Sequence, residues 1–185
     1  ILKGLEVEPP TKAGEVRQHG VTVARYRGAP AEDCGYLLER LCQWLSSETF
    51  SAPPGYEIVY GILKAIMAHI YIAWIHPFGD GNGRTARLLE VRILLEARAP
   101  SAAAHLLSNY YNETRSEYYR QLDGASQSGG DVLPFIQYAA QGFCEELRAQ
   151  IDEIRKEQHA VTWQNYVHEL FRNKNSPSDK RRRDL

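Results

Sequence analysis

Apolar positions recur at helical spacing along most of the chain. Residues 31–47 carry apolar side chains three or four positions apart, and residues 56–75 are almost continuously apolar, which predicts a helix buried on most sides. The helical pattern resumes over residues 82–97 and ends at Pro100. Further helices are predicted from about residue 101, over 114–122, over 132–154 with Asp131 as N-cap, and over 161–171.

One segment before these helices has a strand-like pattern. Three valines alternate with polar residues on either side of His19-Gly20, which predicts a short β-hairpin over residues 15–27. The sequence holds no second β segment that could build a sheet with it. We therefore expect an all-α protein: a compact helical bundle with one small β-hairpin attached.

The predicted organisation is a connector, one domain and a tail. Residues 1–14 have the proline and glycine content of a connector, and residues 15–171 form the domain, with the hairpin at 15–27 and the helical core at 31–171. Residues 172–185 form a tail in which six basic residues against two acidic ones leave a charge of +4. A nucleic-acid or localisation role, a solvated tail and the start of a further domain all fit this composition.

The overall charge excludes a general attraction to anionic partners. The 22 Lys and Arg residues face 23 Asp and Glu residues, which gives a net charge of −1, so nucleic acid is not an expected partner. No uninterrupted apolar run approaches 18 residues, and no membrane contact is expected. Cys34, Cys42 and Cys144 lack the spacing of a metal site or a redox pair. We expect them to be small buried side chains in a cytoplasmic, reducing compartment.

The segment most informative about function joins the two most apolar helices. Residues 76–87 read His-Pro-Phe-Gly-Asp-Gly-Asn-Gly-Arg-Thr-Ala-Arg. Gly81 and Gly83 have no Cβ, so the N–H groups around them can converge on one anion at the positive end of the following helix. Arg84 and Arg87 are three positions apart on that helix and can reach the same anion. Two guanidiniums beside such a nest favour a polyphosphate over a carboxylate.

Two more residues of this segment carry chemistry. Asp80 offers a hard oxygen ligand to the Mg²⁺ that accompanies ATP. His76 lies on the opposite lip of the loop, and histidine is the side chain best able to accept a proton near neutral pH. Taken singly, each feature has a structural alternative: a hydrogen-bonding histidine, a tight glycine turn, an arginine pair on a solvated face. Their occurrence within twelve residues favours a nucleotide site with a base.

The same segment matches, at all nine specified positions, the signature H-P-F-x-D/E-G-N-G-R-x-x-R of the Fic family. The chain resembles this family over about residues 8–158. The resemblance implies a helical core with a β-hairpin flap, and the transfer of AMP from ATP to a hydroxyl side chain of another protein. A kinase-like branch of the family has Ala and Lys in place of Gly81 and Gly83, so the resemblance favours AMP transfer.

The roles of the family's residues carry over onto this sequence by position. His76 becomes the general base for the incoming Ser, Thr or Tyr hydroxyl, and Asp80 becomes the ligand of Mg²⁺. Asn82 and the N–H groups around Gly81 and Gly83 would bind the α-phosphate. Arg84 and Arg87 would bind the β- and γ-phosphates.

The resemblance also implies contacts to adenine and to the target protein. Tyr118 and Tyr119 would contact the adenine, with an aromatic core as the alternative, and Ser126 stands where some relatives have Asn. The flap would hold an extended, hydroxyl-bearing loop of the target by strand addition, with a simple lid as the alternative. The flap residues are Val21, Thr22, Val23, Ala24, Arg25 and Tyr26.

Other functions and the mode of regulation stay open at this level. UMP transfer, phosphocholine transfer, AMP removal and a non-catalytic nucleotide-binding interaction module are the alternatives to protein AMPylation. Many members of the family contain an inhibitory helix with the pattern [S/T]-x-x-x-E-[G/N], which this sequence lacks. Since the chain begins at Ile1, we expect the inhibitory helix in an N-terminal segment outside this sequence or in a partner.

Overall fold

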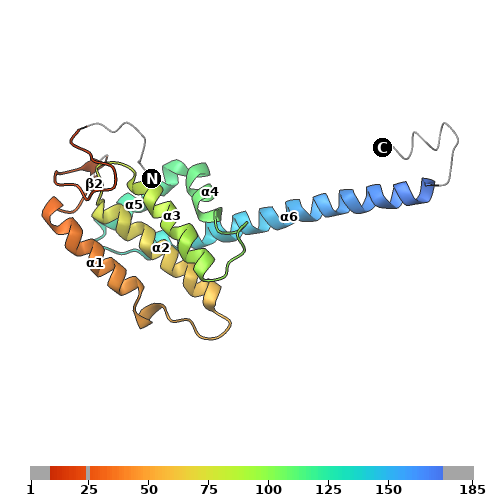
Figure 1. Ribbon diagram of the computed structural model, residues 1–185, viewed down its shortest axis with the longest axis horizontal. Helices are drawn as coiled ribbons and strands as arrows, with labels where there is room; N and C mark the ends of the chain where they lie inside the picture. Colours follow the sequence, from red (N-terminus) through yellow and green to blue (C-terminus); the bar gives the residue numbers. More distant parts are fainter. Residues whose placement is uncertain (1–8, 24–25, 173–185) are drawn as a thin grey trace. The chain divides into compact units, whose positions relative to one another are not determined.

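The computed structural model describes residues 9–23 and 26–172 of the chain. This part contains six α-helices and one antiparallel pair of short strands, which confirms the predicted all-α class with a small hairpin (Figure 1). The helices are α1 (Cys34–Leu45), α2 (Glu57–Ile75), α3 (Asn82–Glu96), α4 (Leu106–Glu113), α5 (Arg115–Gln127) and α6 (Leu133–Phe171), with 3₁₀ turns at Ala31–Asp33 and Glu48–Phe50.

The central helix of the core is α2, which packs against both α1 and α3 (Figure 1). Its almost continuous apolar run explains this place, because a helix that is apolar on most sides needs neighbours on most sides. The helix is also long and apolar enough to cross a membrane, with a mean hydropathy of 1.7, but a buried core helix meets the same criterion. Several of its side chains are fully buried, among them Ala65, Ile66, Ala68, His69 and Ile70.

A cluster of aromatic rings joins α4, α5 and the first turns of α6. Tyr111 on α4, Tyr118 on α5 and Phe135 on α6 lie with their ring centres 5.0–6.3 Å apart. His69 of α2 contacts all three rings. The cluster therefore fixes α5 against the central helix, close to the end of α2 from which the functional loop leaves.

The hairpin consists of β1 (Thr22–Val23) and β2 (Tyr26–Arg27), with Thr22 opposite Arg27 and Val23 opposite Tyr26. Val21 continues the pairing, because its carbonyl accepts a hydrogen bond from the N–H of Gly28 over 3.0 Å. The flap residues Ala24 and Arg25 lie outside the described residues.

The hairpin is shorter than the predicted span of residues 15–27, because both strands lie after His19-Gly20. Residues 15–21 form no strand. Their backbone has another partner, since the N–H of Arg17 donates to the carbonyl of Pro77 over 2.9 Å. A period-2 pattern alone does not separate such a segment, bound through its backbone to the functional loop, from a strand in a sheet.

The C-terminal helices differ from the sequence prediction. Two helices were expected over 132–154 and 161–171, but α6 is continuous because residues 155–160 contain no Gly or Pro and consist largely of good helix formers. Asp131 does cap it, as its carboxylate accepts the N–H of Leu133 over 3.0 Å. The structure divides into two compact units, Ile1–Cys144 and Glu145–Leu185. The predicted tail at 172–185 lies, apart from Arg172, outside the described residues.

The cysteine prediction holds for one residue of three. Cys34 is fully buried, whereas Cys42 and Cys144 are exposed, so the expectation of three buried side chains is wrong. Both exposed cysteines lie on the outer faces of amphipathic helices, where the helical period and not the residue type decides burial. All three are free thiols.

Candidate active site

The loop between α2 and α3 begins and ends with left-handed backbone. His76 caps the C-terminus of α2 with φ 49° and ψ 56°, and Gly81 caps the N-terminus of α3 with φ 84°. Glycine adopts this conformation freely, whereas a residue with a Cβ does so at a cost in energy. The glycine at 81 is thus required by the turn, and the backbone of His76 must be held in place by its surroundings.

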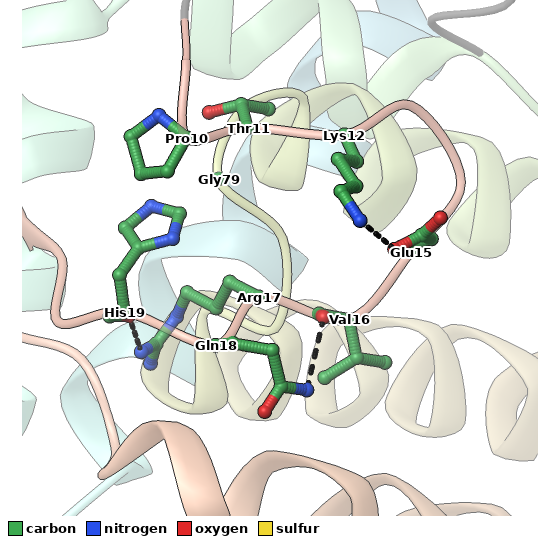
Figure 2. A pocket seen from close by; sticks show the side chains of 9 residues that line it. All are labelled: Pro10, Thr11, Lys12, Glu15, Val16, Arg17, Gln18, His19 and Gly79. Carbon is green, nitrogen blue, oxygen red and sulfur yellow. Dashed lines mark hydrogen bonds and ion pairs between the residues drawn. The ribbon is translucent and has the colours of Figure 1, made fainter.

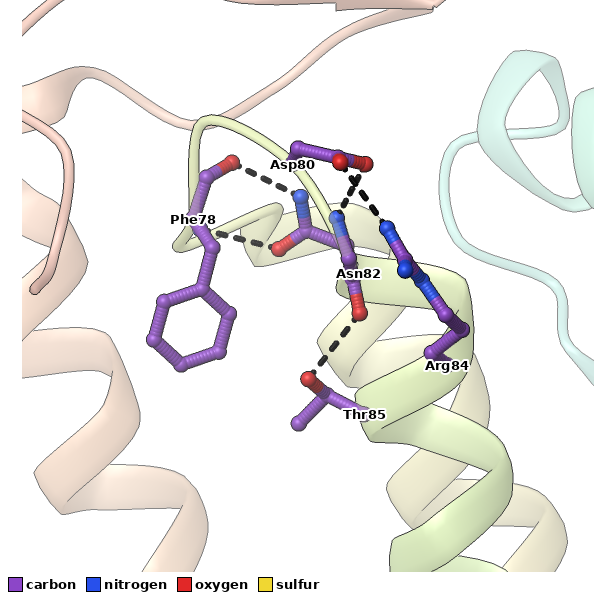
Figure 3. A network of polar contacts seen from close by, with 6 residues as sticks. Phe78, Asp80, Asn82, Arg84 and Thr85 are labelled. Atoms are coloured by element: carbon purple, nitrogen blue, oxygen red, sulfur yellow. Dashed lines mark hydrogen bonds and ion pairs between the residues drawn. The ribbon is translucent and has the colours of Figure 1, made fainter. Parts of the chain in front are cut away.

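A network of hydrogen bonds folds the loop onto the first turn of α3 (Figure 3). The Asn82 amide, which is 3% exposed, accepts the N–H of Phe78 over 2.9 Å and donates to the Phe78 carbonyl over 2.7 Å. The hydroxyl of Thr85 donates to the carbonyl of Gly81 over 3.0 Å. The first free N–H groups of α3 are thereby held at a fixed place, where a helix N-terminus attracts anions.

Six of the nine residues predicted to act in catalysis or nucleotide binding line one pocket of about 210 Å³. The loop and α3 contribute His76, Asn82, Gly83 and Arg87 to its lining, and α5 contributes Tyr118 and Tyr119. The remaining lining residues are Tyr26, Ala73, Trp74, Leu122 and Ser126. The structure therefore brings together a histidine, a helix N-terminus, an arginine and two tyrosines that are far apart in sequence.

Asp80, Gly81 and Arg84 adjoin this pocket without lining it. One carboxylate oxygen of Asp80 accepts a hydrogen bond from the N–H of Gly81 (Figure 3). The other accepts one from Nη2 of Arg84 over 2.8 Å. The Asp80 and Arg84 side chains are 58% and 43% exposed. An exposed ion pair of this kind contributes little stability, so both groups can exchange partners when a ligand brings its own charges.

The ring of His76 has a defined orientation and protonation state. Its Nδ1 lies 3.3 Å from the carbonyl of Ala73, and since a carbonyl only accepts, Nδ1 carries the hydrogen. Burial lowers the pKa of His76, which outweighs the opposite effect of the bond to Ala73. The imidazole is therefore neutral at pH 7, and its Nε2 is the nitrogen able to accept a proton.

The two tyrosines of α5 differ in their environments. Tyr118 is 7% exposed, and its hydroxyl lies 2.8 Å from Nε2 of His69. Burial, together with the nearby Glu90, raises the pKa of Tyr118 well above its ordinary value. Tyr119 is 48% exposed, with the guanidinium of Arg115 over its ring. Tyr118 is thus both a core residue and a pocket wall, while Tyr119 offers an accessible ring face.

Sequence reasoning missed three buried polar side chains, those of Arg17, His69 and Glu90. His69 and Glu90 are both 0% exposed, and Arg17 is 3% exposed. His69 and Glu90 each interrupt an apolar run, at positions 69 and 90, and that interruption was a signal of a buried polar pair. Nothing in the local pattern around Arg17 distinguishes it from a surface arginine.

Comparisons with known proteins identify the family. The model of the Fic/DOC family matches residues 2–94. Proteins named protein adenylyltransferase fic-1 from Caenorhabditis briggsae and protein adenylyltransferase Fic from Drosophila melanogaster are 36% and 34% identical over 134 and 131 residues. A solved structure of Fic-1 from C. elegans matches with a TM-score of 0.59 and 28% identity, covering 81% of this chain and 40% of that one.

The chain belongs to the Fic/DOC family, as the resemblance of residues 76–87 predicted. The matches with the two named relatives cover 71% of this chain, but the chain spans only about a quarter of their length, 23% and 24%.

Proposed function

We propose that this chain is a protein adenylyltransferase that moves AMP from ATP to a Ser, Thr or Tyr hydroxyl of another protein. The observation that carries the proposal is the convergence of the neutral His76, the N-terminus of α3 and Arg87 on one pocket. Transfer of label from ATP to protein, in the presence of Mg²⁺ and a cell lysate, tests it. A chain that binds ATP but labels no protein would instead act as a nucleotide-binding module.

The reaction that fits this geometry is an in-line displacement at the α-phosphorus. The hydroxyl oxygen of the target forms a bond to the α-phosphorus while its proton passes to Nε2 of His76. The bond from the α-phosphorus to the bridging oxygen breaks, and its electron pair leaves on pyrophosphate. The target keeps the AMP group, and the proton on His76 returns to solvent or to pyrophosphate.

The charge that develops on the phosphates would be stabilised by groups already in place. The N–H groups at the start of α3 would donate to the phosphates. The guanidinium of Arg87 lies beside Gly83, since a Cβ added there would be 3.4 Å from Arg87 Nη1. Asn82 holds the loop through Phe78 and keeps a second Nδ2 hydrogen for the α-phosphate. These donors need no rearrangement when the substrate binds.

The residues of the loop fit Mg²⁺ that arrives with the nucleotide. Among the described residues no group of three or more His, Cys, Asp or Glu side chains could hold a metal ion, which suits an ion held by one carboxylate and by phosphate oxygens. Asp80 would hold it, and Arg84 would then turn from Asp80 to the terminal phosphates. The ion would neutralise part of the phosphate charge.

Arg87→Ala should weaken ATP binding about ten- to a hundredfold and leave AMP binding nearly unchanged, because charge-assisted hydrogen bonds to phosphate contribute roughly 1.5–3 kcal/mol. Calorimetry with each nucleotide measures the difference. Arg92→Ala, on an exposed position of the same helix, is the matched control. Equal losses for ATP and AMP would place Arg87 away from the terminal phosphates.

Thr22→Pro should lower transfer to the target protein at least about tenfold without changing ATP affinity, if the flap adds the target as a strand. Val21 and Gly28 share a hydrogen bond, so alternation turns the backbone groups of Thr22 outward to the free edge. Proline removes that outward N–H, which an edge position tolerates.

The comparison for this test is Thr22→Val, which keeps the N–H. Rates on one extended peptide substrate, with ATP affinity measured beside them, separate docking from nucleotide binding. An unchanged rate for a folded Thr22→Pro protein would show that the hairpin is a lid and not a docking edge.

A further inference from the structure

Arg17 is a buried arginine whose hydrogen bonds go to the main chain. Its Nε donates to the carbonyl of His76 and its Nη1 to that of His19, both over 2.6 Å, and its Nη2 donates to the carbonyls of Ala29 and Ile75. None of the ion pairs among the described residues includes Arg17. A guanidinium is seldom buried without a carboxylate, so this one needs an explanation.

The end of α2 supplies that explanation. The last carbonyls of a helix have no N–H partner within the helix and carry its partial negative charge. Arg17 binds the carbonyls of Ile75 and His76, and the hydroxyl of Tyr26 donates to the carbonyl of Trp74. The segment before the flap, together with the flap, therefore caps the helix that ends at His76, and the helix dipole stabilises the buried charge.

The same contacts hold the left-handed backbone of His76. Arg17 binds two successive carbonyls of the loop: its side chain donates to the carbonyl of His76, and its own N–H donates to the carbonyl of Pro77 over 2.9 Å. A Cβ added to Gly28 would lie 3.0 Å from both Arg17 Nη2 and His76 Cβ, so the three residues are packed together.

The surrounding chain is packed against the loop as well. Figure 2 shows Pro10, Thr11 and the following residues crossing beside Gly79, with Arg17 directed away from that crossing toward His19. Thr11 leaves no space for a side chain at Gly79. The segment from Pro10 to His19 thus packs against the loop and binds it through hydrogen bonds.

We propose that Arg17 is a positioning residue, which fixes the main chain of His76 so that its imidazole faces the reacting hydroxyl. This inference rests on the proposed function of His76 as a base. The charge of Arg17 acts in the same direction as burial, since both lower the pKa of His76 and keep the ring neutral. Arg17 touches neither nucleotide nor target in this scheme.

Two substitutions separate the geometry from the charge. Arg17→Lys keeps a positive charge but loses the planar fork that reaches several carbonyls at once, and Arg17→Met loses both. Lys12→Met, at a side chain that is 73% exposed in the same segment, is the control. Tyr26, Arg87, Tyr118 and Tyr119, the other ionisable side chains around the pocket, are unchanged in all three variants.

The first measurement needs neither ATP nor a target. The ring signals of His76 are assigned by their loss in His76→Ala and titrated by NMR. In Arg17→Met we expect the pKa of His76 to rise and its ring signals to shift, and in Arg17→Lys we expect the signals to shift with a smaller rise in pKa. Lys12→Met should titrate as the wild type does.

The second measurement is transfer. Since a misplacement of about 1 Å can cost about 10²-fold in rate, kcat should fall about 10²-fold in Arg17→Met and about tenfold in Arg17→Lys. The KM for ATP should stay within about twofold of the wild-type value, because the N-terminus of α3 is untouched. The acid limb of the profile of kcat against pH should move to higher pH, and the largest shift is expected in Arg17→Met.

The outcomes are distinct. A folded Arg17→Met protein with the titration and kcat of the wild type overturns the inference, and so does a loss of ATP affinity that parallels the loss of kcat. If Arg17→Met does not fold, Arg17→Lys decides, and a wild-type kcat there overturns it. A wild-type chain that labels no protein contradicts the proposed function, whereas the NMR titration still tests the contact of Arg17 with His76.

Discussion

His76→Ala should lower the rate of AMP transfer by at least about 10²-fold and leave the affinity for ATP within a few-fold of the wild-type value. The structure gives the reason for this division. His76 lines the pocket with a neutral ring whose Nε2 is available. In the proposed reaction it acts on the hydroxyl of the target, whereas the phosphates would bind at the N-terminus of α3 and at Arg87, which the substitution leaves unchanged. Labelled ATP with a protein target gives the rate, and calorimetry gives the affinity.

The matched control for this experiment is His105→Ala, at an exposed histidine that precedes α4. It should transfer AMP at the wild-type rate. A His76→Ala variant that keeps more than about a tenth of the wild-type rate would show that His76 is not the general base, because removal of a base costs at least about 10²-fold. A parallel loss of ATP affinity would instead assign His76 to nucleotide binding.

The functional loop could be predicted from sequence because its chemistry is contained in twelve consecutive residues. A buried helix, a glycine at the turn and a second helix bring His76 and Arg87 to one pocket. The exact backbone of His76 also depends on a distant residue, because Arg17 binds its carbonyl. The place of Tyr118 in the same pocket could not be derived from the local sequence pattern. It depends on the packing of α5 against α2 through His69, which no spacing along the sequence reveals.

Distant contacts also explain where the local patterns were wrong. The valines near His19 follow a strand period, but the backbone of Arg17 is bound to Pro77 and not to a second strand. The break expected after residue 154 required a helix-ending signal that residues 155–160 do not contain, so α6 continues. In both cases the sequence pattern allowed two structures, and tertiary hydrogen bonds or the absence of a Gly or Pro breaker decided between them.

The second large effect is expected from substitution of the buried polar pair His69 and Glu90. Nδ1 of His69 lies 3.1 Å from Oε2 of Glu90, close enough for an ion pair, although the two atoms are not aligned as a hydrogen bond. The other oxygen of Glu90 accepts the hydroxyl of Tyr111 over 3.2 Å, and Nε2 of His69 lies 2.8 Å from the hydroxyl of Tyr118. The pair therefore connects α2 and α3 to both tyrosines of the aromatic cluster.

Glu90→Ala should lower the free energy of unfolding by about 3 kcal/mol or more, since it leaves His69 and the Tyr111 hydroxyl buried without their partner and opens a cavity. Chemical denaturation followed by near-UV circular dichroism, which reports on the packed rings, measures this loss. Glu96→Ala, at an exposed glutamate of the same helix, should change stability by less than about 0.5 kcal/mol.

The double variant His69→Phe/Glu90→Leu decides whether the effect comes from the unpaired partner. It replaces both polar groups by apolar side chains, so it should cost less than the sum of the two single substitutions. Additive losses would mean that the two residues act independently and that the 3.1 Å contact contributes nothing. Because Tyr118 loses its partner on His69, the double variant should also bind ATP more weakly than wild type, which calorimetry measures directly. Unchanged ATP binding would show that the Tyr118 ring keeps its place in the pocket without the hydrogen bond.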